Sequence, residues 1–291
     1  MSHEPTGLAV YDKTAEDAAA AVISSYSTSF GLATRLLGPR PRPHVRNVYA
    51  LVRIADEIVD GPATAAGLDS VAVAAVLDEL ETEAIAAIER GFSSNLVVHA
   101  FARTARECGI GEALIEPFFR SMRTDLLTTR HDGASHDDYV YGSAEVVGLM
   151  CLQVFVNAGA RHPTVPDADL VDGARRLGAA FQDVNFLRDQ HHDEDALGRD
   201  YLGLASGGAT RAHVLDRIDA DLAAAAAVIP RLPADSRRAV TAAHDLFASL
   251  STRLRRESAS TARVRVPDPV KAALAARAWL GFAPRSGAPR A

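Results

Sequence analysis

The sequence has few cysteines, few aromatic residues and no excess of positive charge. Its two cysteines, Cys108 and Cys151, show no CxxC spacing. Neither a disulfide framework nor a zinc site is therefore expected, and a reducing, cytoplasmic location fits. The formal net charge is -6 and the isoelectric point is near 5.9, whereas a nucleic-acid-binding protein should show a basic face. We expect no nucleic-acid partner.

Long apolar runs and several catalytic motifs are missing as well. The first residues, MSHEPTGLAVYDK, lack the charged and then apolar build of a signal peptide. No apolar run reaches the roughly 18 residues of a membrane-spanning helix, so no transmembrane segment is expected. GxGxxG, P-loop, GxSxG and HExxH motifs do not occur. Dinucleotide-binding, nucleotide-hydrolysing, serine-hydrolase and zinc-protease functions are therefore without support.

What the sequence does contain is helical periodicity. Apolar residues recur at spacings of three and four from about Thr14 to about Trp279, and strand-like alternation is nearly absent. The breaks between periodic segments, none of them long enough to separate domains, are Gly38–Pro43, Gly61–Pro62, Arg161–Asp169, Gly203–Arg211 and the RVPDP run. We predict an all-α fold with a single domain over residues 14–281, a mobile N-terminus over 1–13 and a mobile tail over 282–291.

The stretch LVRIADEIVDG (Leu51–Gly61) places two acids one turn apart at the end of a helix. Asp56 and Asp60 repel each other at this spacing by roughly a few tenths of a kcal/mol. They also face the negative end of the helix dipole, which costs roughly 0.3–1 kcal/mol. With Tyr49 and Arg53 they form a stripe beside the apolar one, at the edge of the buried face. One such pair indicates either a solvated surface or a cation site.

The stretch FQDVNFLRDQHHDED (Phe181–Asp195) repeats this layout. Its polar stripe consists of Gln182, Asn185, Asp189 and Asp193 and ends in a second Asp-xxx-Asp pair. Two such helices facing one another would place four carboxylates around one cavity. A divalent cation with oxygen ligands, Mg²⁺ above all, would relieve their repulsion and commonly binds substrate phosphates too. Arg53 and Arg188 beside the acids fit a phosphorylated ligand, because guanidinium groups match phosphate oxygens.

The segment Ala144–Ala160 is unusually apolar. Two interpretations of it stay open. It is either a central core helix or a core helix that lines an apolar tunnel, with Gly148 leaving room for a ligand chain.

Five stretches of the chain carry a resemblance to a known family. They are SYSTSFGLATRLL, YALVRIADEIVDG, YVYGSAEVVGLM, LGAAFQDVNFLRDQHHD followed by LGRDYL, and ARVRV, in this order from about Ser25 to Val266. Together they resemble the squalene/phytoene synthase family of head-to-head prenyltransferases. The resemblance implies a helical bundle of the isoprenoid-synthase type around a central cavity. It also implies an enzyme that uses Mg²⁺ to ionise allylic prenyl diphosphates.

The resemblance further implies roles for single residues. The magnesium ligands would be Asp56, Asp60, Asn185, Asp189 and Asp193. Positions around the diphosphates would be Tyr26, Ser29, Arg53, Tyr139, Gln182, Asn185, Arg188 and Arg263. Arg53 and Tyr139 join the four aspartates as expected catalytic residues. Metal and guanidinium charge would stabilise the leaving diphosphate while an allylic carbocation forms in a dry pocket.

The sequence departs from the family pattern at three places. Leu246, beside Phe247, stands where the family usually has a tyrosine, and Gly203 stands where a proline usually follows GRDYL. Asp183 stands where close relatives often carry a basic or apolar residue. None of these changes touches the four aspartates, so ionisation of the first substrate is expected to be intact. What they leave open is which acceptor molecule reacts with the cation, and Leu246 is the substrate-binding position expected to decide it.

Three functions are therefore weighed. The leading hypothesis is the condensation of two prenyl diphosphates to a phytoene- or squalene-like product. The second is transfer of a short, dimethylallyl-like prenyl group to an aromatic small-molecule acceptor, which the loss of the tyrosine at Leu246 motivates. The third, a catalytically silent lipid-binding or assembly relative, ranks last because such relatives are expected to lose aspartates. Peripheral contact with a membrane would serve product release.

Overall fold

The described part of the chain is built from helices. The computed structural model describes residues 7–128, 132–192, 200–204, 209–256 and 264–285, and within these ranges it holds no β-sheet. The elements are α1 (Gly7–Tyr26), α2 (Thr28–Arg35), α3 (Pro41–Val59), α4 (Pro62–Ala65), α5 (Ser70–Arg90), α6 (Leu96–Cys108), α7 (Glu112–Leu127), α8 (Gly133–Val140), the π-helical turn η1 (Tyr141–Glu145), α9 (Val146–Asn157), α10 (Ala168–His192), α11 (Arg211–Val228), the 3₁₀ turn η3 (Ile229–Arg231), α12 (Ala234–Arg256) and α13 (Asp268–Trp279). The predicted all-α fold is confirmed.

Local chemistry explains where the helices begin and end. α3 begins at Pro41, which suits the first turn because an N–H at that position would lack an intrahelical partner anyway. It ends just before Gly61, whose φ of 122° is a conformation that glycine adopts without strain. At α6 the side chain of Asn95 caps the first turn, and Gly109 ends the helix in the left-handed region. The predicted breaks at 61–62 and 161–169 thus lie between helices.

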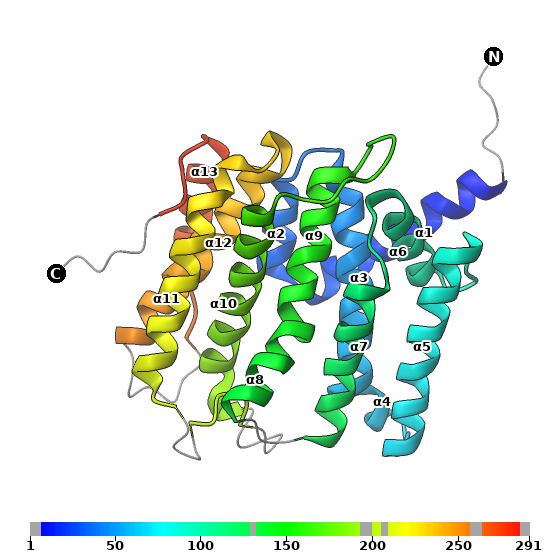
Figure 1. The fold of residues 1–291 in the computed structure, drawn as a ribbon, viewed down its shortest axis with the longest axis horizontal. Coiled ribbons are helices and arrows are strands. Elements are labelled where there is room, and N and C mark those ends of the chain that lie inside the picture. Colours follow the sequence, from blue (N-terminus) through cyan, green and yellow to red (C-terminus); the bar gives the residue numbers. More distant parts are fainter. Residues whose placement is uncertain (1–6, 129–131, 193–199, 205–208, 257–263, 286–291) are drawn as a thin grey trace.

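The long helices lie side by side, and several of their ends meet at one end of the bundle (Figure 1). α9 packs against α3, α7 and α10. The C-terminal ends of α3, α7 and α10 and the start of α8 all lie at the lower end of the bundle in the view of Figure 1. Because both predicted acidic stripes end there, the fold brings them to the same end of the molecule.

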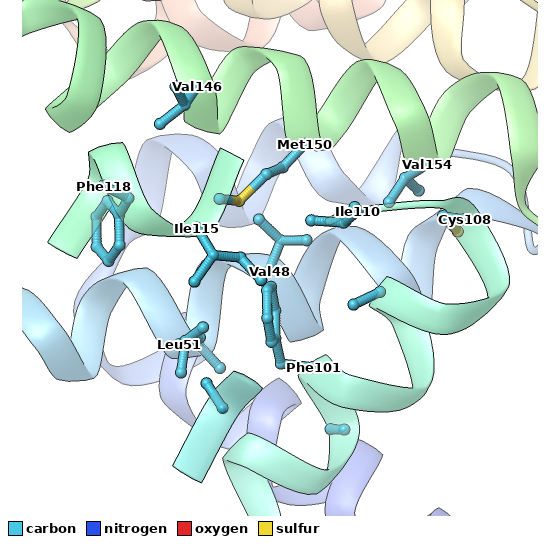
Figure 2. Packing of buried hydrophobic residues seen from close by; sticks show 14 of the residues in the cluster. Val48, Leu51, Phe101, Cys108, Ile110, Ile115, Phe118, Val146, Met150 and Val154 are labelled. Carbon is cyan, nitrogen blue, oxygen red and sulfur yellow. The ribbon is translucent and has the colours of Figure 1, made fainter. Parts of the chain in front are cut away.

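Two apolar clusters form the core. The first joins α1, α3, α5, α6, α7 and α9, and Figure 2 shows Met150 of α9 pointing toward Val48 of α3 and Ile115 of α7. The second joins α8, α10, α11, α12 and α13 and includes Val184 and Phe247. Burial of such side chains stabilises the fold by about 1.5–3 kcal/mol for each large one.

A π-helical turn separates α8 from α9. It packs against α7, and a Cβ added to Gly142 would lie 2.2 Å from the carbonyl oxygen of Pro117. Only glycine therefore fits this approach of η1 to the backbone of α7. Such turns are frequent at functional sites, and this one follows directly after Tyr139 and Val140.

The two ends of the chain are better anchored than predicted. α1 begins at Gly7, so the predicted mobile N-terminus over 1–13 is corrected for residues 7–13. Tyr11 donates a hydrogen bond to the carbonyl of Ser93 at 2.9 Å, and Asp12 lies 2.8 Å from Nε2 of His99. At the other end, the backbone N–H of Arg285 donates to Asp245 at 2.8 Å. Residues 286–291 lie outside the described part.

Within the described ranges, one helix is by length and composition alone apolar enough to cross a membrane. It is the continuous run Gly133–Asn157 of α8, η1 and α9, 25 residues long with a mean hydropathy of 1.5 over its most apolar window. No such segment was expected, because the sequence holds no sufficiently long uninterrupted apolar run. A mean over a window of residues tolerates single polar residues, so this helix passes. A core helix meets the same measure, and α9 contributes Val146, Met150 and Val154 to the first cluster (Figure 2). Peripheral membrane contact stays a prediction.

Candidate active site

The C-terminal half of α3 presents a polar, half-buried stripe. Arg53 and Asp56 keep part of their surface exposed, and Asp60 at the helix end is exposed. The backbone N–H of Asp60 donates to the carbonyl of Asp56 at 2.9 Å, so the two acids sit on the last turn as predicted. Arg53 forms an ion pair with Glu57, and its guanidinium lies 4.7 Å from the ring centroid of Tyr26. The structure therefore brings together three predicted residues of the diphosphate site: Tyr26, Arg53 and Asp56.

Asp56 is the most perturbed carboxyl group of this stripe. Burial raises the pKa of Asp56 to about 8, and the neighbouring Asp60 carboxylate adds to the shift. The Arg53 guanidinium opposes the shift, while Asp125 of α7 reinforces it. A carboxyl group in this setting holds its proton near neutral pH until a positive charge replaces that proton. Such a carboxyl group can bind a divalent cation in exchange for its proton.

α10 carries the second stripe on its last turns. Gln182, Asn185, Arg188 and Asp189 are all half-buried. The guanidinium of Arg188 turns to its own neighbour, with Nε 3.0 Å from Oδ1 and Nη2 2.5 Å from Oδ2 of Asp189. Arg188 thus neutralises the carboxylate that the sequence assigns to a metal.

Three predicted positions fall wholly or partly outside the described residues. Asp193 and Arg263 lie outside them, and Ser29 lies in α2 with a side chain that is not described. The assignments of these three residues stay predictions.

A buried group that the sequence reading missed lies beside the first stripe. Asp125 of α7 accepts hydrogen bonds from the hydroxyl groups of Tyr139 at 2.7 Å and Tyr201 at 3.0 Å. Burial raises the pKa of Tyr139 well above its usual value, with Asp125 adding to the shift, so the hydroxyl stays a donor. The sequence did hold a hint of this group. One buried face of α7 carries Phe118, Met122 and Asp125, and a lone acid on an apolar face is rarely left without a partner.

The donor chemistry of these helix ends fits Mg²⁺. Among the described residues, no three His, Cys, Asp or Glu side chains come close enough to hold a metal ion by themselves. Mg²⁺ needs no such cage, because it typically takes one or two carboxylates together with waters and substrate phosphates. Asp56 and Asp60 on α3 and Asp189 on α10 offer such carboxylates at the same end of the bundle (Figure 1).

Gly148 has a different role from the predicted one. A Cβ at this position would lie 2.7 Å from the carbonyl oxygen of Ala174, and a Cβ on Gly178 would lie 2.7 Å from the carbonyl oxygen of Ala144. The two glycines therefore let the backbones of α9, η1 and α10 touch. The interpretation of Gly148 as a tunnel wall that leaves room for a ligand is corrected: its open side faces another helix.

Gly148→Ala is expected to destabilise the fold by about 1–3 kcal/mol, because overpacking against backbone forces the helices apart. Gly31→Ala is the control, since a Cβ there would meet nothing within 4 Å. That variant is expected to be neutral or to gain up to about 1 kcal/mol from helix propensity. Urea unfolding of the two variants measures the difference. Equal stability of the Gly148 variant and the wild type would contradict the close contact.

Leu246 lies on α12 in the second apolar cluster. It is partly buried, and its neighbour Phe247 stacks on Phe181 of α10 with ring centroids 3.8 Å apart and an interplanar angle of 19°. Because Phe181 directly precedes Gln182, this apolar wall adjoins the polar stripe of α10. The role of Leu246 at the substrate site stays a prediction.

Comparisons with known proteins agree with this arrangement. The Squalene/phytoene synthase family model matches residues 23–205. Over 202 residues the chain is 32% identical to phytoene synthase 3, chloroplastic, of Zea mays, covering 67% of this chain and 45% of that protein. Over 185 residues it is 31% identical to a 15-cis-phytoene synthase of a Paracoccus species, covering 62% and 57%. The chain spans about half the length of these curated relatives.

Solved structures show the same fold. A dehydrosqualene synthase in complex with a ligand aligns with a TM-score of 0.77 at 23% identity and covers 92% of this chain and 96% of that one. Squalene synthase HpnC from Alicyclobacillus acidocaldarius aligns with a TM-score of 0.71 at 21% identity and covers 85% and 95%. The family match spans the candidate site from Tyr26 to Tyr201, and with it the chain belongs to the squalene/phytoene synthase family.

Proposed function

We propose that this chain is a Mg²⁺-dependent prenyltransferase that ionises an allylic prenyl diphosphate and joins two such molecules head to head. The observation that carries the proposal is Asp56, a half-buried carboxyl with a pKa raised to about 8 beside Asp60. It lies at the end of the bundle that also holds Asp189 (Figure 1). The names of the curated relatives, phytoene synthases, support the same chemistry.

The residues that would hold Mg²⁺ are Asp56 of α3, Asp60 directly after that helix, and Asn185 and Asp189 of α10, together with Asp193, which lies outside the described residues. When bound, the metal supplies Lewis-acid stabilisation of the charge that develops on the leaving diphosphate.

The two arginines of the stripes bind the diphosphate in this proposal. Arg53 pairs with Glu57 and Arg188 pairs with Asp189 in the described structure. With a cation held by Asp189, the guanidinium of Arg188 would be free to bind phosphate oxygens. Tyr139 is a neutral hydroxyl held by Asp125, and it presents a fixed dipole to the reacting end of the substrate. The apolar clusters on either side exclude water from the cation.

Product analysis tests the function. Purified protein with Mg²⁺ and prenyl diphosphates of graded length is expected to yield a coupled hydrocarbon from farnesyl or geranylgeranyl diphosphate, detected by mass spectrometry. The same mixture with EDTA is expected to yield none. Absence of any coupled product from either substrate would overturn the head-to-head proposal.

The apolar wall beside Gln182 favours a second candidate, transfer of a dimethylallyl group to an aromatic acceptor. Phe181 and Phe247 stack on each other in the second apolar cluster, and Leu246, which packs against the same cluster, brings no hydrogen-bonding group. An aromatic ring would fit against such apolar side chains, whereas a second diphosphate would need donors there. Prenylation of a supplied phenol or indole by dimethylallyl diphosphate, without coupled hydrocarbon, would select this candidate.

Leu246→Tyr distinguishes the two acceptors. For head-to-head coupling the added hydroxyl is expected to preserve or raise the yield of coupled product, because it supplies a donor to the second diphosphate. For an aromatic acceptor the polar group is expected to lower the rate about tenfold, since it places an unpaired hydroxyl in an apolar wall. Leu246→Met conserves the volume and is the control. Coupled hydrocarbon yield that falls in the Tyr variant and not in the Met variant would contradict the first expectation.

A further inference from the structure

Three charged or ionisable side chains from three helices meet in the interior next to the candidate site. Asp183 of α10 and His136 of α8 are only 1% and 4% exposed. Arg217 of α11 donates to Oδ2 of Asp183 from Nε at 3.1 Å and from Nη2 at 2.8 Å. The same Nη2 lies 2.8 Å from Nε2 of His136, which is itself 3.0 Å from Oδ1 of Asp183. The Arg217 side chain is itself 35% exposed, and its Nη1 also lies 3.6 Å from Oδ1 of Asp137. We refer to these three residues as the triad.

A buried ionic group of this kind adds little to stability. Removing charges from water costs several kcal/mol per ion, so apolar residues of similar volume are often equally stable or more stable. The net contribution of the triad to the free energy of folding is therefore expected to be small. Its role is better sought in the groups that it holds in position.

The second ring nitrogen of His136, Nδ1, binds a backbone group outside the triad. Nδ1 of His136 lies 2.7 Å from the carbonyl oxygen of Tyr201. A carbonyl oxygen only accepts, so Nδ1 carries the proton and donates it, which fixes the tautomer and the ring orientation. The remaining nitrogen, Nε2, lies between Nη2 of Arg217 at 2.8 Å and Oδ1 of Asp183 at 3.0 Å. His136 is thus locked from both sides, and it ties down the backbone at Tyr201.

Tyr201 in turn is tied to the candidate site. Its hydroxyl donates to Asp125, the carboxylate that also accepts from Tyr139. Its ring stacks on Phe186 with centroids 4.3 Å apart at 10° and lies 5.3 Å from the ring of Tyr139. Tyr201 belongs to the short non-helical segment 200–204, so these side-chain contacts take the place of a helical backbone in holding it.

We propose that Asp183, His136 and Arg217 are positioning residues for the reaction: they fix Tyr201, and through the shared carboxylate of Asp125 they set the hydroxyl of Tyr139 beside Asp56. The inference rests on the proposed function for its effect on turnover. Its effect on segment 200–204 does not depend on that function. Asp183, which departs from the family pattern, thereby acquires a role in this chain.

The test replaces the charged pair by apolar residues of similar size. The Asp183→Leu/Arg217→Met double variant removes both charges together, so neither is left buried and unpaired. Its matched control is Asp221→Leu/Arg176→Met, which removes an ion pair (3.1 Å) between the same two helices, α10 and α11. Both variants are compared with the wild type by urea unfolding, and assays are run where all three are folded.

Two readouts decide the outcome. In the triad variant, kcat for diphosphate release is expected to fall about 10- to 100-fold with KM within about twofold, because the reacting groups are misplaced while binding groups are intact. Hydrogen exchange in peptides covering 200–204 is expected to accelerate in the triad variant and to stay unchanged in the control. Unchanged exchange, or an unchanged kcat in the folded triad variant, would overturn the inference.

A coupling experiment guards against a general loss of structure. His136→Ala removes the bond to the Tyr201 carbonyl, and Tyr201→Phe removes the bond to Asp125. If both act through Tyr201, the double variant is expected to lose no more kcat than the worse single variant. Additive losses would show independent roles and contradict the proposal. If the wild type turns over no prenyl diphosphate, the proposed function fails, and hydrogen exchange alone still decides whether the triad fixes segment 200–204.

Discussion

Replacing Asp60 or Asp189 by Asn is expected to lower the rate of Mg²⁺-dependent diphosphate release by about 10²–10³-fold while the fold is retained. Asn keeps the size of the side chain and removes the negative charge that a divalent cation needs. Stability is not expected to suffer at Asp60, because this acid is exposed and faces the negative end of the α3 dipole. At Asp189 the change leaves Arg188 without its carboxylate partner, but that group is half-buried and reaches solvent.

Release of diphosphate from a prenyl diphosphate of the accepted length is the measurement. Asp172→Asn is the control on α10, since Asp172 is well exposed and pairs only across one turn with Arg176 among the ion pairs of the described residues. It is expected to leave turnover within about twofold, because exposed pairs contribute little. Near-normal turnover in both site variants, or full wild-type activity in EDTA, would contradict the metal site.

The affinity for Mg²⁺ is expected to fall about tenfold per pH unit as the pH drops below 8, because the cation must displace the proton of Asp56. The folded-state pKa of Asp56, about 8, lies above the ordinary aspartate value of 3.8. Without metal, the contribution of this group to stability is therefore greatest below about pH 4 and is lost as the pH rises through about 8. Mg²⁺ reverses this trend because it binds the deprotonated folded form.

Thermal unfolding with and without Mg²⁺ between pH 6 and pH 9 measures both effects. The rise in Tm on adding the metal is expected to be larger at pH 9 than at pH 6. In Asp56→Asn that pH dependence is expected to disappear, and the metal-free protein is expected to be at least as stable as the wild type at pH 9. A Kd for Mg²⁺ that is the same at pH 6.5 and pH 8.5 in the wild type would contradict the raised pKa.

Features that depend on one helix could be predicted from the sequence. The acids of α3 and the polar stripe of α10 follow from spacings of three and four, and the helix end at Val59 follows from Gly61 and Pro62. Their presence at one end of the bundle followed from the family resemblance rather than from spacing, because periodicity does not say which helices are neighbours.

Features that depend on several helices were missed or misread. The partners of Asp125 lie 14 and 76 residues away, and the triad joins three separate helices. Gly148 was interpreted as leaving room for a ligand because a sequence does not show which neighbour lies against a glycine. In the structure that neighbour is the backbone of α10. The N-terminus looked mobile because its anchors, Ser93 and His99, lie far along the chain.

The contact through Gly148 and Gly178 has a consequence for the motion of α9 and α10. Backbone meets backbone along this part of the two helices, so there are no rotamers in the contact whose change could open it. Exposed side chains change rotamer on picosecond to nanosecond timescales, whereas parting two helices is a slower, collective event. The two glycines thus make this pair of helices move as one unit.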